Sequence, residues 1–199
     1  MQKKKTNLDT LHSELWQLYQ NLRMQTKKEW KRTLPFNELL FDRWEKAKFL
    51  GAQKNASVYD NSYIFGDVSI GEKTWIGPYT ILDGSGGKIS IGKYCSISSG
   101  VQIYSHNSVN WSITGGKAGL DKKGVSIGDN CYIGPNSIIT MGSKIGKGSI
   151  IGAFSLVKSI IPSNSIVFGN PAKIVGKINV KGKNVQLRYF KKNTHSVKK

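Results

Sequence analysis

An aliphatic residue recurs at every sixth position along most of the chain, and this period constrains the fold more than any other feature. The runs are Ile127, Ile133, Ile139, Ile145, Ile151 and Val157; Val58, Ile64, Ile70, Ile76 and Leu82; and Ile91, Ile97 and Ile103. Amphipathic helices repeat every three to four residues and half-buried strands every two, so neither produces this pattern. A period of six predicts short strands separated by tight corners, with the aliphatic side chains pointing inward.

Most six-residue units also carry a small residue four positions after the aliphatic one, and Gly often follows the aliphatic residue directly. Three such units close a triangular turn of about 18 residues, in which each aliphatic side chain stacks on its equivalent in the next turn. The predicted fold is therefore mainly β, a parallel β-helix. Cys95 and Cys131 occupy the small inward position, so we interpret them as core residues rather than nucleophiles or metal ligands.

The chain before residue 55 has a helical period instead. Leucines at positions 8, 11, 15, 18 and 22 line one face of a helix, and we interpret this stripe as ordinary core or packing surface rather than a partner-specific zipper. A second helix is predicted from Pro35 to just before Gly51, with a linker over 26–34. Residues 1–54 are thus an N-terminal helical segment, which we expect to cover the open first turn of the β-helix.

The six-residue period breaks twice, and both breaks fall at the same corner of the triangle. Leu82 and Ile91 are nine residues apart, so the segment DGSGG adds three residues to one turn. Ile103 and Ile127 are 24 residues apart, which adds 18 residues to the next turn. If those 18 residues formed a further turn, its inward positions would carry Val, Gly and Asp, which cannot form an aliphatic stack. Residues 104–126 are therefore predicted to leave the coil as a loop.

Loops on a rigid scaffold commonly hold functional residues, and this one carries His106 three residues after its last inward aliphatic residue. Because imidazole exchanges protons near neutral pH, His106 is our candidate general base. Asp83 lies one turn earlier at the same corner, where it can orient the imidazole; alternatively, it only closes the DGSGG turn. Tyr104 and Trp111 flank the histidine and can stack on an acceptor. Trp111 can equally anchor the loop or pack on a neighbouring subunit.

The repeat over residues 55–177 and the segment GNPAKIVG at 169–176 resemble the hexapeptide-repeat acyltransferases, most closely the sugar O-acetyltransferases and xenobiotic acetyltransferases. The resemblance implies a left-handed parallel β-helix, acetyl-CoA as the co-substrate and a homotrimer with its clefts between protomers. It also implies that the histidine of the extended loop, His106, is the base. Other chemistries occur on the same coil, so the fold alone does not set the reaction.

In that family the pantetheine arm of coenzyme A runs along the coils of two neighbouring protomers. The matching positions here are Pro135, Ala153, Lys158, Ser159 and Lys173, with Lys177 as a weaker candidate. Some relatives carry Arg in place of Lys173. A lysine keeps the cationic contact to the phosphates but loses the bidentate geometry.

The resemblance and the loop together indicate an acetyl-CoA-dependent O-acetyltransferase with a carbohydrate acceptor, for example in surface-polysaccharide synthesis, and with direct transfer from the thioester. An N-acetyltransferase of an amino sugar or nucleotide sugar is the alternative, because the same base serves a neutral amine. Carbonic anhydrases of this coil need several His ligands for zinc, whereas residues 55–177 contain one His. No metal is expected.

The formal charge of +18, from 30 Lys and Arg against 12 Asp and Glu, favours polyanionic partners. A basic nucleic-acid-binding or structural protein is a remote alternative. Coenzyme A phosphates and an anionic membrane or lipid-linked acceptor also explain the basic residues, so no nucleic acid is expected. The C-terminal residues 178–199 are expected to form a flexible basic tail that can contact a membrane surface. Because the first residues lack the apolar stretch of a signal peptide, a cytoplasmic location is expected.

Overall fold

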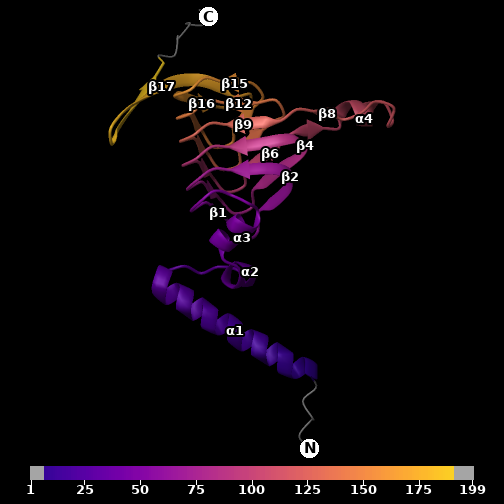
Figure 1. The fold of residues 1–199 in the computed structure, drawn as a ribbon, viewed down its shortest axis with the longest axis vertical. Coiled ribbons are helices and arrows are strands. Elements are labelled where there is room, and N and C mark those ends of the chain that lie inside the picture. Colours follow the sequence, from indigo (N-terminus) through magenta and orange to yellow (C-terminus); the bar gives the residue numbers. More distant parts are fainter. Residues whose placement is uncertain (1–6, 191–199) are drawn as a thin grey trace, which may run out of the picture.

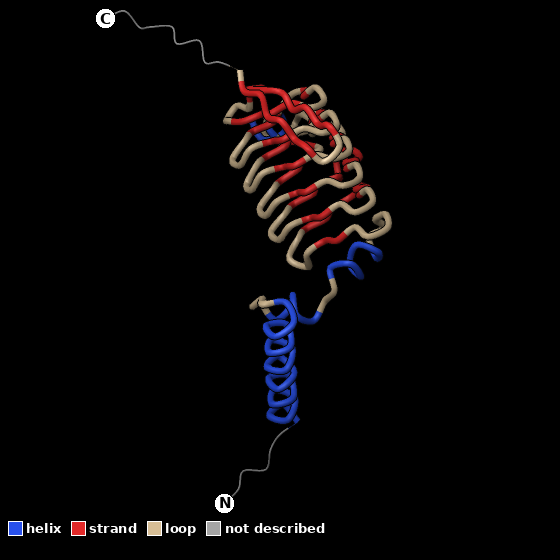
Figure 2. The backbone as a smooth tube through the Cα atoms, turned by 90° about the vertical axis from the view of Figure 1, so that its left-hand side faces the viewer, coloured by secondary structure: helices blue, strands red, loops and turns tan. Residues whose placement is uncertain are grey.

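The structure, a computed structural model, describes residues 7–190, which form a stack of triangular β turns preceded by three helices (Figure 1). The predicted parallel β-helix is confirmed, because strands of successive turns pair in parallel and lie one above another (Figure 2). No helix within the described residues is long and apolar enough to cross a membrane.

One sheet covers the first side of the triangle. Its strands, in spatial order, are β1 (Ser57–Val58), β3 (Trp75–Ile76), β5 (Ser96–Ile97), β10 (Tyr132–Ile133), β13 (Ile150–Ile151), β16 (Ser165–Phe168), β17 (Lys173–Lys181) and β18 (Asn184–Tyr189). The register places Val58, Ile76, Ile97, Ile133, Ile151 and Val167 in one column. All of these side chains are fully buried. Each contributes about 1.5–3 kcal/mol through burial, so this column is a main source of the coil's stability.

A second sheet covers the other two sides, because β4 (Ile81–Ile91) runs through the corner between them. Its order is β14 (Leu156–Val157), β11 (Ile138–Ile139), β6 (Gln102–Tyr104), β4, β9 (Val125–Ile127), β12 (Lys144–Ile145) and β15 (Ile160–Ile161), with β2 (Tyr63–Ile70) paired along β4. Leu82, Ile103, Ile139 and Val157 stack in register, as the period predicts. The two sequence breaks therefore do share one corner.

Small inward residues satisfy the backbone at the corners, and both cysteines do this. The thiol of Cys95 donates to the carbonyl of Gly128 at 3.1 Å, and that of Cys131 donates to the carbonyl of Gly146 at 3.3 Å. Both side chains are buried in the core, and neither forms a disulfide. The interpretation of these cysteines as core residues is confirmed.

The helical segment differs from its prediction in two respects. Helix α1 (Asn7–Trp30) runs through most of the expected linker. The second helix is divided into α2 (Phe36–Leu40) and α3 (Arg43–Phe49), because the side chain of Asp42 accepts the backbone N–H groups of Trp44 and Glu45 and starts a new helix.

Helix α3 covers the first turn of the coil, as expected for the helical segment. Its Ala47 is buried in the core of the coil. The Lys46 ammonium donates to three backbone carbonyls of the first turn, those of Tyr59, Asp60 and Ser62, at 2.6–3.1 Å. Burial lowers the pKa of Lys46, and the facing Asp60 carboxylate partly opposes this. A partly buried ammonium with three backbone acceptors thus joins the helix to the coil.

Among the described residues the leucine stripe of α1 is not part of a core, so its interpretation as ordinary core is wrong. No residue of α1 is buried, and Leu8, Leu11, Leu15 and Leu18 are 41–76 % exposed. Figures 1 and 2 show α1 standing apart from the β-helix and reaching it only through α2 and α3.

The C-terminal segment also differs from its prediction. Residues expected to form a flexible tail from 178 onward continue β17, which turns at Gly182 and returns as β18. The hairpin pairs antiparallel with β16 and so extends the first sheet beyond the last turn. The rest of the expected tail, from residue 191, lies outside the described residues.

Candidate active site

The second break leaves the coil as an arm, which Figure 1 shows projecting from the side of the stack. Strand β7 (His106–Asn107) pairs antiparallel with β8 (Asp121–Lys122), and α4 (Val109–Ile113) lies between them in sequence. The Asn107 side chain accepts the backbone N–H of Val109, the first residue of α4, at 3.0 Å. An excursion is therefore present but shorter than the predicted 104–126, because Tyr104 belongs to coil strand β6 and Val125 and Ser126 belong to coil strand β9.

His106 stands at the base of this arm and beside Asp83. Nδ1 of His106 lies 3.8 Å from Oδ1 of Asp83, and both side chains are largely buried, with 26 % and 17 % exposed. Nδ1 is itself buried and has no hydrogen-bond partner. The same Asp83 oxygen accepts the N–H of Ser85 at 3.0 Å. The carboxylate thus closes the DGSGG turn and also faces the imidazole, and whether it orients His106 stays a prediction.

Two residues that the sequence analysis did not single out fix this geometry. Ser105 is fully buried; its hydroxyl donates to the carbonyl of Asp83 at 2.8 Å and accepts the N–H of Gly86 at 2.9 Å. A Cβ atom on Gly86 would lie 2.4 Å from Cβ of His106, so only glycine allows this approach. The paired glycines of DGSGG were a signal of such a close approach.

The two aromatic candidates lie in different places. Tyr104 directly follows Ile103 in β6, next to Asp83 in register, and its hydroxyl donates to Gln102. Burial raises the pKa of Tyr104, and the Asp83 carboxylate raises it further. Trp111 lies in α4 and is half exposed, and its indole is the group nearest to Gly116. Tyr104 therefore belongs to the base of the arm, and Trp111 to its outer part.

The candidate coenzyme A contacts divide between two corners. Pro135 and Ala153 follow the column of the first sheet at one corner, where the N–H of Phe154 donates to the carbonyl of Pro135 at 3.0 Å. Lys173 pairs with Phe168 at the end of the same side. Lys158 and Ser159 instead follow Val157, at the corner that holds His106. One chain therefore does not bring the five residues together.

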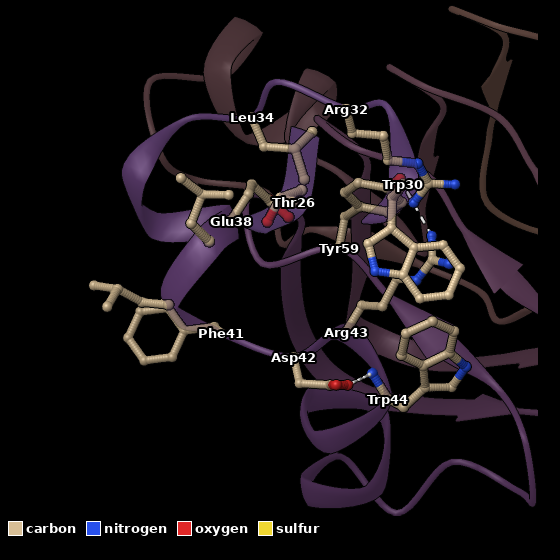
Figure 3. A pocket seen from close by; sticks show the side chains of 12 residues that line it. Thr26, Trp30, Arg32, Leu34, Glu38, Phe41, Asp42, Arg43, Trp44 and Tyr59 are labelled. Carbon is tan, nitrogen blue, oxygen red and sulfur yellow. Dashed lines mark hydrogen bonds between the residues drawn. The ribbon is translucent and has the colours of Figure 1, made fainter. Parts of the chain in front are cut away.

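A separate pocket of about 350 Å³ lies between the helices and the first turn, and none of the predicted site residues lines it. Figure 3 shows Arg43 between aromatic rings: its guanidinium lies 4.2 Å from the centre of the Trp44 ring and donates to the Tyr59 hydroxyl at 3.2 Å. These contacts join α3 to the coil. Among residues 7–190 no group of three or more His, Cys, Asp or Glu side chains is placed to hold a metal ion.

Comparisons with known proteins agree with this architecture. The family profile "Bacterial transferase hexapeptide (six repeats)" matches residues 124–159. The match is limited to these residues. Together with the solved structures described next, it confirms the predicted resemblance to the hexapeptide-repeat acyltransferases. No curated protein sequence matches the chain.

Several solved structures share the fold of this chain. The hexapeptide-repeat acetyltransferase VCA0836 of Vibrio cholerae, in complex with acetyl-CoA, is 23 % identical over 84 % of this chain and 89 % of its own, with a TM-score of 0.62. The polySia-specific acetyltransferase NeuO is 28 % identical over 67 % of this chain and 64 % of its own, with a TM-score of 0.56. The N-acyltransferase AntD of Bacillus cereus, bound to dTDP and coenzyme A, is 24 % identical over 66 % of this chain and 87 % of its own, with a TM-score of 0.56.

Proposed function

We propose that this chain is an acetyl-CoA-dependent O-acetyltransferase with a carbohydrate acceptor, and that His106 is its general base. The observation that carries the proposal is the pairing of the His106 imidazole with Asp83 at the base of the arm, 3.8 Å apart and largely shielded from water. The repeats and the solved relatives, which include acetyltransferases and an acyltransferase, support the reaction class.

In the proposed reaction the acceptor hydroxyl attacks the thioester carbonyl carbon while Nε2 of His106 takes the hydroxyl proton. The tetrahedral intermediate then collapses, the carbon–sulfur bond breaks, and the departing sulfur takes the proton from the imidazolium. Asp83 faces Nδ1, so its negative charge stabilises the imidazolium formed between these steps. Catalytic contacts in unliganded enzymes are often long, and closure by about 1 Å would turn the Nδ1–Oδ1 approach into a hydrogen bond.

The donor site is proposed to lie between two copies of the chain. Pro135, Ala153 and Lys173 on one corner would face the His106 corner of a neighbour, which carries Lys158 and Ser159. The lysines would hold the phosphates of coenzyme A, and a homotrimer would create three such clefts. Tyr104 and Trp111 are proposed to contact the acceptor. No metal takes part in this scheme.

The acceptor class is proposed from the relatives alone. NeuO is described as polySia-specific, which favours an oligomeric or polymeric carbohydrate and a role in surface-polysaccharide synthesis. AntD is described as an N-acyltransferase and was solved with dTDP, so the alternative is an amino group on a nucleotide sugar. A cytoplasmic enzyme would meet both kinds of acceptor.

The decisive experiment measures release of the coenzyme A thiol from acetyl-CoA across sugars, nucleotide sugars, amino sugars and oligosaccharides. The best acceptor is then used with His106→Ala and, as a matched control, His12→Ala in α1. We expect loss of turnover by about 100-fold or more only in the first variant. Full activity of His106→Ala would overturn the assignment of the base. Acetylation of an amino group but of no hydroxyl would replace the O-acetyltransferase with the alternative.

A further inference from the structure

Helix α1 presents an apolar stripe that no other part of the described chain covers. Leu8, Leu11, Leu15 and Leu18 are 76, 51, 44 and 41 % exposed. Helix α2 covers only the side next to the stripe, where the rings of Tyr19 and Phe36 meet edge to face at 5.5 Å. In proteins most of the stability of a helix comes from packing of its apolar face, so the stripe needs a partner.

The spacing of the stripe is that of a coiled coil. Leucines 8, 11, 15, 18 and 22 follow steps of three and four, which is the a and d pattern of the heptad, with a period of 3.5 rather than 3.6. The next two seam positions are Gln25 and Glu29, so the apolar seam ends just before the helix does at Trp30.

The residues that flank the seam allow pairing with an identical helix. In a parallel, in-register pair, each g position faces the following e position of the partner. Glu14 then faces Tyr19, and Asn21 faces Thr26. Like charges oppose each other only at Glu29, the last seam position, where the apolar seam has already ended.

The charge of α1 argues against a membrane surface as its partner. Helices that lie on anionic membranes carry mainly Lys and Arg on the polar face. In α1 the basic residues Arg23, Lys27 and Lys28 are balanced by the acidic residues Asp9, Glu14 and Glu29, although the whole chain carries +18. The helix therefore lacks the excess positive charge that a membrane-bound helix uses.

We propose that α1 is a self-association element: the leucine seam packs in parallel and in register against α1 of a second copy of this chain. The coils of such copies would point the same way, which is also the arrangement needed for clefts between neighbours. This inference does not depend on the acetyl-transfer reaction, because it rests only on α1.

Disulfide trapping in the full-length chain tests the proposal. Leu11→Cys and Leu18→Cys lie at seam positions, where a parallel pair brings each residue next to its own copy. Ser13→Cys, on the opposite face, is the matched control. Under mild oxidation we expect both seam variants to form dimers of the chain at least tenfold faster than the control. Equal rates for all three variants, or linkage only in a mixture of the two seam variants, would overturn the parallel seam.

A second measurement separates this seam from other partners. The double variant Leu11→Glu/Leu18→Glu should lose much of the helical circular dichroism at 222 nm, because unpaired α1 unfolds. Ser13→Glu/Gln20→Glu adds the same charge on the outer face and should keep the signal. Unchanged helicity in the leucine variant contradicts the proposal, as does α1-dependent binding of the wild-type chain to anionic phosphatidylserine vesicles that the leucine variant abolishes.

Discussion

Adding a single methyl group at Gly86 should disable the site without unfolding the coil. The new Cβ would lie 2.4 Å from Cβ of His106 and 2.7 Å from the carbonyl oxygen of Ser105. Carbon atoms in contact normally stay about 3.5 Å apart, so either the arm or the turn must move by about 1 Å. A displacement of about 1 Å in catalytic geometry costs on the order of 100-fold in rate. Overpacking of this kind also costs about 1–3 kcal/mol of stability.

Gly119 offers the matched control, because it lies in the arm that leaves the coil at the same corner and a Cβ there would meet nothing within 4 Å. The assay compares kcat/KM for thiol release with the best acceptor, together with thermal unfolding, in Gly86→Ala and Gly119→Ala. We expect the loss of rate only in Gly86→Ala and a folded protein in both. A Gly86→Ala enzyme with wild-type kcat/KM would refute the argument that close packing of the turn positions His106.

Three further predictions concern groups outside the proposed proton transfer. Lys46→Met should lower the free energy of unfolding by about 2–4 kcal/mol in denaturant titration, because three backbone carbonyls lose a charged donor; an unchanged midpoint would contradict this anchoring role. Cys95 and Cys131 should react with a thiol reagent only as fast as the coil unfolds, since both thiols are buried and donate to carbonyls, and the neighbouring Cys95 thiol together with burial raises the pKa of Cys131; rapid labelling of the native protein would disagree. In tyrosine-labelled NMR titrations, Tyr104 should have a pKa above the usual value, and Asp83→Asn should lower that pKa. An unchanged pKa of Tyr104 in Asp83→Asn would contradict the proximity of the Asp83 carboxylate to Tyr104. Because the folded pKa is raised, the stability that Tyr104 contributes is present below pH ~10 and decreases as the pH rises further.

The coil could be predicted closely from the sequence because its determinant is local and repeated. An inward aliphatic residue every six positions fixes both the strand and its partner, and the register of Leu82 with Ile103 followed from counting alone. The shared corner of DGSGG and the arm followed in the same way. It was therefore predictable from the sequence that His106 would lie close to Asp83.

The finer geometry was not predictable, because it depends on contacts between turns. Nothing in the period shows that Ser105 bonds to both Asp83 and Gly86. At the N-terminus, helical spacing alone could not distinguish a continuous second helix from one restarted by Asp42. Beyond residue 177 the mixture of basic and apolar residues resembled a tail, whereas pairing with the exposed edge of β16 makes it a hairpin.

Ala153 and the other candidate coenzyme A contacts at its corner lie away from the corner of the coil that holds His106, and this division limits how the proposed reaction could occur. The interior between the corners is filled by columns of fully buried aliphatic side chains, so no substrate can pass through the coil from Ala153 to His106. A donor held along the Ala153 corner can therefore reach a base only from outside the coil. In the proposed scheme that base is His106 of another copy, so the scheme includes association of the chain whichever acceptor is used. The leucine seam of α1 would supply a contact that favours association with the coils in parallel, so its loss should lower activity most strongly at low protein concentration.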